Sequence, residues 1–168
     1  MRLCAIAALL LTLFVSTACT FKRKEVRTVQ LGEKAEIGPF IYRAFETQWP
    51  IALGDRNAKD RFFTIRLSIL NSGSAETTIP SFEIVDDQGN SYPEVSDGTA
   101  VEGWLGITRK VGVAQTEQGS IVFDVPPKHY RLRVADENDN FMYIDIPLNL
   151  NSEEPAQKKL FETAPVSK

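Results

Sequence analysis

The chain has one histidine, His129, and it is the first residue to consider for catalysis. Hydrolytic mechanisms of the Ser–His–Asp or Cys–His type need a positioned base, a nucleophile beside it and a third group that orients the base. His129 follows Pro126-Pro127-Lys128 at the expected start of a strand, and no nucleophile motif accompanies it. The sequence therefore predicts a protein that is not an enzyme and that needs no cofactor.

Two acidic segments, residues 86–90 and 136–140, carry the hard oxygen ligands that calcium prefers. The second segment holds the candidate ligands Asp136 and Asp139, but it lacks the alternating spacing and the distal glutamate of an EF-hand loop. Asp and Asn also favour turns, so a solvated hairpin turn is the preferred interpretation of each segment. A calcium site would need the two turns to meet at one end of the fold. Binding of calcium or of a small ligand is kept as the alternative function.

Cys19 is the candidate for a different chemistry, the attachment of a lipid. Residues 5–15 form an apolar run behind Arg2 that is too short to span a membrane, which takes about 20 residues, and that suits a secretory signal segment. The small residues 16–18 then precede Cys19, whose thiol would accept a diacylglyceryl group. Ser16 stands where a lipobox usually has Leu, so ordinary signal cleavage is the alternative. We expect a lipoprotein signal peptide over 1–18, a lipidated Cys19 and a tether over 19–25.

These expectations define a compartment and exclude some partners. Lipidation would hold the protein on a membrane of the bacterial cell envelope with its domain outside the cytoplasm. Thr20, rather than Asp, follows the cysteine, which mildly favours the outer membrane if the host has two membranes. Lys22-Arg23-Lys24 is interpreted as a solvated tether, with contact to anionic headgroups as the alternative. The net charge of −3 disfavours nucleic-acid binding.

The rest of the chain has the pattern of strands separated by turns. In residues 61–71, Phe63, Ile65, Leu67 and Ile69 alternate with polar residues, as expected for a strand with one buried face. Similar alternation over residues 119–126, 129–136 and 141–148, with no convincing amphipathic helix, predicts an all-β, immunoglobulin-like antiparallel β-sandwich of about seven to nine strands over residues 26–148. The polar residues 149–168 are predicted to be a disordered tail.

Four aromatic residues are candidates for a partner surface. Trp49 and Trp104 lie outside the clearest buried-face patterns, and exposed tryptophan is common at binding hot spots. The alternative is that each caps an end of the core, because tryptophan is usually largely buried. Phe141 and Tyr143 alternate with Met142 and Ile144, so they are expected on the outer face of a sheet, either as a contact surface or as an inter-strand pair.

The order of the segments GPFIYRA, FFTIRLSILNSGS, SFEIVDDQGNSY, GSIVFDVP and YRLRV resembles the immunoglobulin-like, or telokin-like, domains of unknown function found in bacterial lipoproteins. Those domains are similar in fold to a secreted mycobacterial immunoprotective antigen. The resemblance covers about residues 26–148 and implies a β-sandwich in the cell envelope, with no catalytic residues to transfer. The chain departs from the family pattern before VFDVP, where VAQTEQGS replaces the usual Pro-Gly turn and leaves the shape of that loop open.

Together these observations predict a lipid-anchored cell-envelope protein with a non-catalytic interaction or scaffolding module. Its partners would be the membrane, through Cys19, and an envelope protein. The contact surface is expected at loops at one end of the sandwich or at an exposed strand edge, since such an edge can accept another strand.

Overall fold

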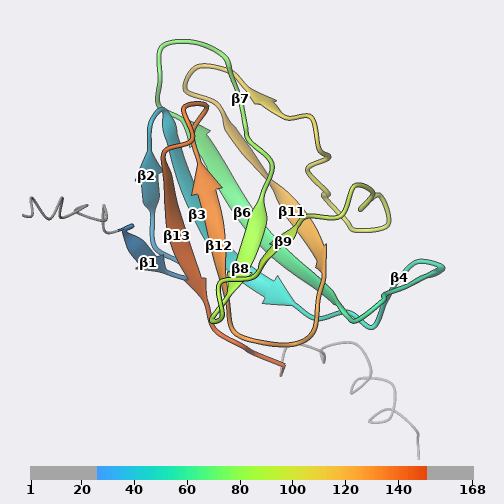
Figure 1. The fold of residues 1–168 in the computed structure, drawn as a ribbon. Helices are drawn as coiled ribbons and strands as arrows, with labels where there is room; N and C mark the ends of the chain where they lie inside the picture. The colour runs from blue at the N-terminus through green and yellow to red at the C-terminus, as the bar shows by residue number, and fades with distance from the viewer. Residues whose placement is uncertain (1–25, 151–168) are drawn as a thin grey trace, which may run out of the picture.

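The computed structural model describes residues 26–150, and within that range the chain forms thirteen β-strands and no helix. The two main sheets are packed face to face (Figure 1). The predicted signal peptide, Cys19, the predicted tether over residues 19–25 and residues 151–168 of the predicted tail lie outside the described residues.

The first sheet has five strands in the order β1-β13-β12-β8-β9. Its members are β1 (Thr28–Gln30), β13 (Phe141–Ile146), β12 (Tyr130–Ala135), β8 (Glu83–Asp86) and β9 (Ser91–Pro93). Neighbouring strands are antiparallel except at one edge, where β1 lies parallel to β13 with Val29 opposite Ile144. The sandwich is thus antiparallel, as predicted, apart from this one edge pair.

The second sheet has four antiparallel strands in the order β11-β6-β3-β2. These are β11 (Thr116–Asp124), β6 (Phe62–Asn71), β3 (Phe40–Gln48) and β2 (Ala35–Ile37). The two sheets together hold nine strands, which agrees with the predicted number. The other four strands form two short antiparallel pairs, the hairpin of β4 (Ala52–Leu53) with β5 (Arg56–Asn57) and the distant pair of β7 (Thr77–Thr78) with β10 (Lys110–Val111).

The core lies between the two sheets and follows the alternation of the sequence. The apolar residues of β6 at positions 63, 65, 67 and 69 are at most 1% exposed, and the inward residues of β12 and β13 are also buried. Trp49 is 1% exposed and stacks on Phe63 with 4.1 Å between ring centroids. The hypothesis that Trp49 belongs to a partner surface is therefore wrong, because its ring completes the core where β3 ends.

Asn71 explains the shape of the loop that replaces the Pro-Gly turn before β11. Its side-chain amide donates hydrogen bonds to the carbonyls of Ala75 (2.7 Å) and Val111 (3.0 Å), and its own carbonyl accepts the N–H of Ala114 at 3.0 Å. Ala114 adopts a left-handed conformation with φ of 57°. One buried asparagine thus fixes both the turn after β6 and the turn that leads into β11.

A second hydrophobic cluster lies on the outer face of the second sheet. Leu53, Phe62 and Val122 form it, and Trp104 packs against it. The cluster exists because residues 95–105 fold back over β11, where Val95 donates to the carbonyl of Val122 (2.8 Å) and Leu105 donates to that of Ser120 (3.0 Å). This segment therefore covers the outward edge of β11.

A buried ion pair holds the long connection between β9 and β10. The Arg109 guanidinium contacts the Glu94 carboxylate, and their side chains are only 2% and 4% exposed. Glu94 also accepts the backbone N–H of Phe82 at 3.0 Å, and Arg109 lies over the Phe82 ring, 5.0 Å from its centroid. Removal of either charge would leave the other buried without its counter-ion, which is strongly destabilising.

Candidate functional site

Two regions bring polar side chains together: a cluster around the turn between β8 and β9, and a groove on the outer face of the second sheet. The turn region (residues 86–90, the first acidic turn) forms locally. Asp86 Oδ1 accepts the backbone N–H groups of Gln88 (3.0 Å) and Asn90 (2.9 Å). Gly89 has a φ of 86°, which this turn requires and which glycine adopts without strain.

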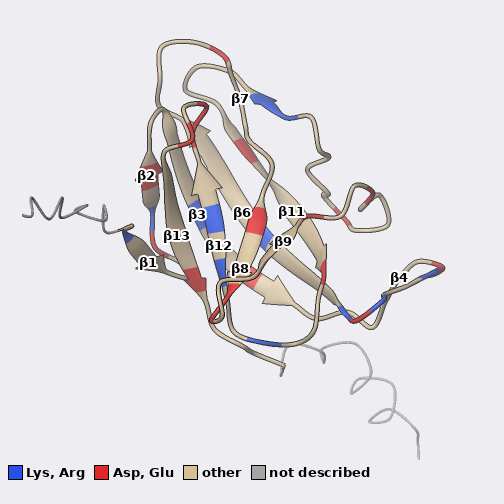
Figure 2. Cartoon of the chain, viewed as in Figure 1, with Lys and Arg blue, Asp and Glu red and all other residues tan. Residues whose placement is uncertain are grey.

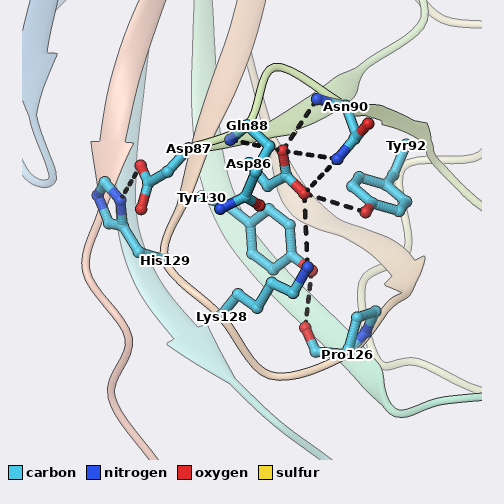
Figure 3. Close-up of polar contacts among 9 residues, drawn as sticks. All are labelled: Asp86, Asp87, Gln88, Asn90, Tyr92, Pro126, Lys128, His129 and Tyr130. Atoms are coloured by element: carbon cyan, nitrogen blue, oxygen red, sulfur yellow. Dashed lines mark hydrogen bonds and ion pairs between the residues drawn. The ribbon is translucent and has the colours of Figure 1, made fainter.

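Asp86 is held as a carboxylate by these bonds. The side-chain amide of Asn90 is the main cause that lowers the pKa of Asp86 to about 2, against the opposing effect of burial, and the Tyr92 hydroxyl adds to it (Figure 3). Lys128 Nζ lies 3.5 Å from Asp86 Oδ2. The buried carboxylate is thus fully surrounded by donors.

His129 lies next to this turn, and Figure 3 shows its ring beside the Asp87 carboxylate. Its Nδ1 is 2.8 Å from Asp87 Oδ1, and its Nε2 is 2.9 Å from Asp145 Oδ1. The hydrogen bond to Asp87 raises the pKa of His129, burial opposes the rise, and the bond to Asp145 adds to it. Because both ring nitrogens face carboxylates, the imidazolium is favoured and neither nitrogen is left to take a proton from a nucleophile.

The second acidic turn (residues 136–140) has the same hydrogen bonds as the first. Asp136 Oδ1 accepts the N–H groups of Asn138 and Asn140, both at 2.9 Å. Burial acts to raise the pKa of Asp136, but the bonds from Asn140 and Asn138 outweigh it and lower the pKa below its ordinary value. Asp139, the other candidate calcium ligand, instead pairs with Arg133.

The two acidic turns do not meet. Asp86 is opposite Tyr130 at the start of β12, whereas the second turn follows Ala135 at the end of β12. Figure 2 shows the acidic residues of the two turns at opposite ends of the first sheet. The hypothesis of one shared calcium site is therefore wrong. Among residues 26–150, no group of three or more His, Cys, Asp and Glu is arranged to hold a metal ion.

Phe141 and Tyr143 lie on the outer face of the first sheet, as the alternation predicted. Their rings meet edge to face with 5.6 Å between centroids. Arg133 lies 4.4 Å from the Phe141 centroid and Arg131 lies 4.9 Å from that of Tyr143. The rings are thus half-buried beneath two guanidinium groups. Trp104 is also half-buried, against the second hydrophobic cluster, and its indole N–H has no acceptor among the described residues.

The groove, called here the hairpin groove, is a hollow of about 400 Å³ between the β4–β5 hairpin and residues 100–103. Its floor is the outer face of β3, β6 and β11. Its walls are two loop segments, residues 50–53 and residues 100–103. The lining residues are Glu46, Gln48, Pro50, Leu53, Thr64, Arg66, Ala100, Val101, Glu102, Gly103, Gln118, Gly119 and Ser120. A volume of this size lies in the range of ligand sites in proteins, about 300–1,000 Å³.

The hairpin groove combines apolar walls with polar groups that are free to bind. Arg66 lies 3.7 Å from Glu46, which also accepts a hydrogen bond from Gln48 at 2.9 Å. The side chains of Glu102 and Gln118 have no hydrogen-bond or ionic partner among residues 26–150. Sequence reasoning missed this site. Its only signal was the polar side of the β3, β6 and β11 alternation, which by itself looks like a solvated face.

The strand edges expected as an alternative contact surface are short or covered. The edge strands β1, β9 and β2 have three residues each. The long edge of β11 is occupied at Ser120, whose N–H donates to Gly103 at 2.8 Å and whose carbonyl accepts Leu105 at 3.0 Å. Short and covered edges discourage the addition of a further strand. The hairpin groove is therefore the better candidate for a binding site.

Two packed sheets with a shared apolar core define this chain as a β-sandwich protein. The chain belongs to the family described as domain of unknown function (DUF4352), whose pattern matches residues 29–146. The predicted resemblance and the predicted fold class are thereby confirmed. No curated protein matches the chain significantly.

Solved structures with a similar fold include a secreted protein and a candidate lipoprotein. The yjhA protein from Bacillus subtilis has 17% identity and a TM-score of 0.57, over 70% of this chain and 98% of that one. The secreted protein MPT63 from Mycobacterium tuberculosis has 12% identity and a TM-score of 0.54, over 73% and 99%. The ycdA protein from B. subtilis, the candidate lipoprotein, has 10% identity and a TM-score of 0.57, over 68% of this chain but only 38% of that one.

These likenesses show the fold alone. Within the described part of the chain, no helix has the length and apolar character needed to cross a membrane.

Proposed function

We propose that this protein is an extracytoplasmic binding module, anchored to a membrane of the bacterial cell envelope through a lipidated Cys19, which binds an envelope protein in the hairpin groove without catalysing a reaction. The observation that carries the proposal is the groove itself, where unpartnered polar side chains face a hollow with apolar walls. The secreted and lipoprotein-like character of proteins with the same fold supports the location.

The geometry of the polar groups supports binding rather than catalysis. Both ring nitrogens of His129 are paired with carboxylates, Nδ1 with Asp87 and Nε2 with Asp145. It also lies at the β8–β9 turn and is not among the residues that line the groove. The groove therefore offers carboxylate, guanidinium and amide groups without the only histidine of the chain. Such groups orient a ligand by hydrogen bonds and charge.

A photo-crosslinking residue in living cells tests the groove. Gln118 lines the groove and is exposed, whereas Gln30 is an exposed glutamine on β1 of the other sheet and serves as the matched control. We expect one recurrent adduct with an envelope protein when the crosslinker replaces Gln118, and none when it replaces Gln30. Equal adducts at both positions, or none at either, would remove the groove as the binding site.

The anchor needs a separate test. Mass measurement of the N-terminal peptide should show an acylated Cys19, and Cys19→Ala should move the protein from the membrane fraction to the soluble fraction. Separation of the two membranes in a host that has both should place the protein in the outer one. An unmodified Cys19 would reduce the proposal to a secreted binding module.

Binding of a small molecule is the second candidate function, because the volume of the groove also suits a compact ligand. A ligand that binds only the folded state raises Tm by mass action. In a thermal-shift screen of envelope metabolites, a raised Tm that Gln118→Ala abolishes would favour this function over protein binding. A screen with no response, together with a crosslinked protein partner, would favour the first.

A further inference from the structure

We propose that residues 158–162 of this chain (KKLFE, here the basic tail segment) occupy the hairpin groove, so that the partner must displace the protein's own tail. The inference rests on the groove of the proposed function, but it concerns a different occupant and can fail independently. Three observations carry it: the chemistry of the groove, the sequence of the tail, and the place where the described chain ends.

The chemistry of the hairpin groove suits an occupant that carries a cation beside an apolar side chain. Glu46 and Arg66 are close enough to neutralise each other, at 3.7 Å, which leaves the carboxylate of Glu102 without a counter-ion among the described residues. Leu53 and Val101 supply apolar walls on the two sides. An occupant with a lysine next to a large apolar residue would satisfy both features at once.

Residues 151–168 contain one such combination. Lys158 and Lys159 directly precede Leu160 and Phe161, the two largest apolar residues of that stretch. An extended peptide places successive side chains on opposite faces, so one lysine and one apolar residue can enter the groove together. The pairing of Lys158 or Lys159 with Glu102, and of Leu160 or Phe161 with the apolar walls, matches the chemistry of the groove.

The last described residues, before the basic tail segment, lie at the same end of the sandwich as the hairpin groove. Ile146, the last residue of β13, is opposite Tyr130. The Tyr130 ring lies 6.4 Å from that of Trp49, which immediately precedes the groove residue Pro50. Figure 1 shows the last described residues leaving the sheets at the end from which the β4–β5 hairpin projects. The eight steps from Leu150 to Lys158 can span up to about 26 Å of extended chain.

An occupant tethered in this way competes strongly with a free partner. A short linker gives the tail an effective concentration in the millimolar range, so even weak contacts keep the groove occupied. A partner would then bind measurably only if its affinity exceeds that competition. The tail would act as an internal competitor that sets a threshold for binding.

A spin label on the tail tests the contact in the full chain from residue 19 onward. In a Cys19→Ser, Thr163→Cys protein, the nitroxide is attached to the only thiol, and the broadening of backbone amide signals is measured by NMR. We expect strong broadening at Glu102, Gln118 and Thr64, and none at Thr28 and Gln30 on the opposite sheet. Even broadening over the whole surface, or broadening centred elsewhere, would overturn the proposal.

Charge reversal sharpens the test. Lys158→Glu with Lys159→Glu should abolish the broadening in the groove, Glu102→Lys should abolish it too, and the three changes combined should restore it. Glu36→Lys, at an exposed residue of β2, is the matched control and should change nothing. Retention of the broadening in both charge-reversed proteins would overturn the proposed contact.

Two further outcomes distinguish this inference from the proposed function. Broadening that appears only when labelled and unlabelled copies are mixed would identify a second copy as the occupant and overturn the internal contact. A crosslinked partner at Gln118 that is captured equally with and without residues 151–168 would leave the proposed function standing and remove the tail as a competitor.

Discussion

The turns at residues 86–90 and 136–140 have the same spacing and the same hydrogen bonds, yet they differ in what surrounds them. In each, an aspartate backbone N–H donates to the carbonyl of the asparagine four residues later at 3.0 Å. In each, the aspartate carboxylate accepts bonds from that asparagine, and the fourth residue has a positive φ, 86° at Gly89 and 59° at Asp139. One local solution is thus used at both ends of the first sheet.

The difference lies in the contacts from distant parts of the chain. The first turn receives Lys128 and His129 from the connection between β11 and β12, and the Tyr92 hydroxyl from β9. The second turn contacts Arg133 through Asp139, and its Glu137 accepts the backbone N–H of Thr78 on β7 at 2.9 Å. In the first turn the central carboxylate, Asp86, is itself contacted from distant parts of the chain, whereas in the second turn the distant contacts are made by Glu137 and Asp139. The comparison shows that a turn can use its first carboxylate for its own hydrogen bonds, and that distant neighbours decide which of its other residues are tied to the rest of the fold.

Removal of the capping carboxylates should have the largest effect. Asp86→Ala and Asp136→Ala each remove the acceptor of two backbone N–H groups of the turn, so we expect Tm to fall on the order of 5–10 °C. The fall should be larger for Asp86→Ala, because Tyr92 and Lys128 also lose their partner. Thermal denaturation followed by circular dichroism measures both. Glu36→Ala, at an exposed residue of β2, is the control, and equal falls in all three proteins would contradict the capping role.

The fourth residue of the two turns should respond in opposite ways. Gly89→Ala forces a side chain into a left-handed conformation and should lower the free energy of unfolding by about 1–2 kcal/mol. Asp139→Gly removes that strain but also the exposed pair with Arg133, so its net effect should be within about 1 kcal/mol. Urea denaturation of both variants tests the pair of predictions. A larger loss for Asp139→Gly than for Gly89→Ala would reverse the comparison.

A dependence on pH should belong to the first turn alone. The pKa of His129 is raised in the folded protein, so its ion pairs with Asp87 and Asp145 stabilise fully below the ordinary histidine pKa of 6.5. That stability is lost as the pH rises through the raised pKa. His129→Gln should therefore lower Tm by a few degrees at pH 6 and by much less at pH 9.

The control for this prediction is Asp139→Asn in the second turn. Its effect on Tm should be the same at pH 6 and pH 9, since no histidine faces that turn. A His129→Gln effect that does not change with pH would show that His129 contributes by packing rather than by charge.

Calcium should have the smallest effect of all. The carboxylates of Asp86 and Asp136 already accept bonds from their own turns, and the turns are at opposite ends of β12. Addition of calcium or of a chelator should shift Tm by less than about 1 °C. A clear increase with calcium that Asp136→Asn removes would restore a calcium site at the second turn.

The strands could be predicted from the sequence because their cause is local. Alternation in β6, β12 and β13 places apolar residues on one face, and the structure buries those residues. The fully buried Val122 could not be predicted in this way, since alternation assigns it to the solvent face. It is buried because residues 95–105, far away in a loop without a periodic pattern, fold over that face.

The candidate sites depended even more on distant contacts. The sequence places His129 at the start of a strand, but only the order of strands in the sheet brings Asp87 and Asp145 to its two nitrogens. The hairpin groove likewise needs two excursions, around residues 50–53 and 100–103, to lie over one face of β6. Nothing in either excursion alone predicts that arrangement. Lipidation of Cys19 remains a prediction.

If Cys19 is lipidated as proposed, the cover over β11 has a consequence at the membrane. Proteins held by lipid anchors are confined to a plane, where neighbours collide far more often than at the same copy number in free solution. An uncovered edge on the nine-residue strand β11 would then favour the pairing of strands from neighbouring domains, and repeated pairing would produce fibres. The backbone N–H and carbonyl of Ser120 already bond to Gly103 and Leu105. Crowded domains should therefore stay separate and free to diffuse in the membrane plane rather than assemble into fibres.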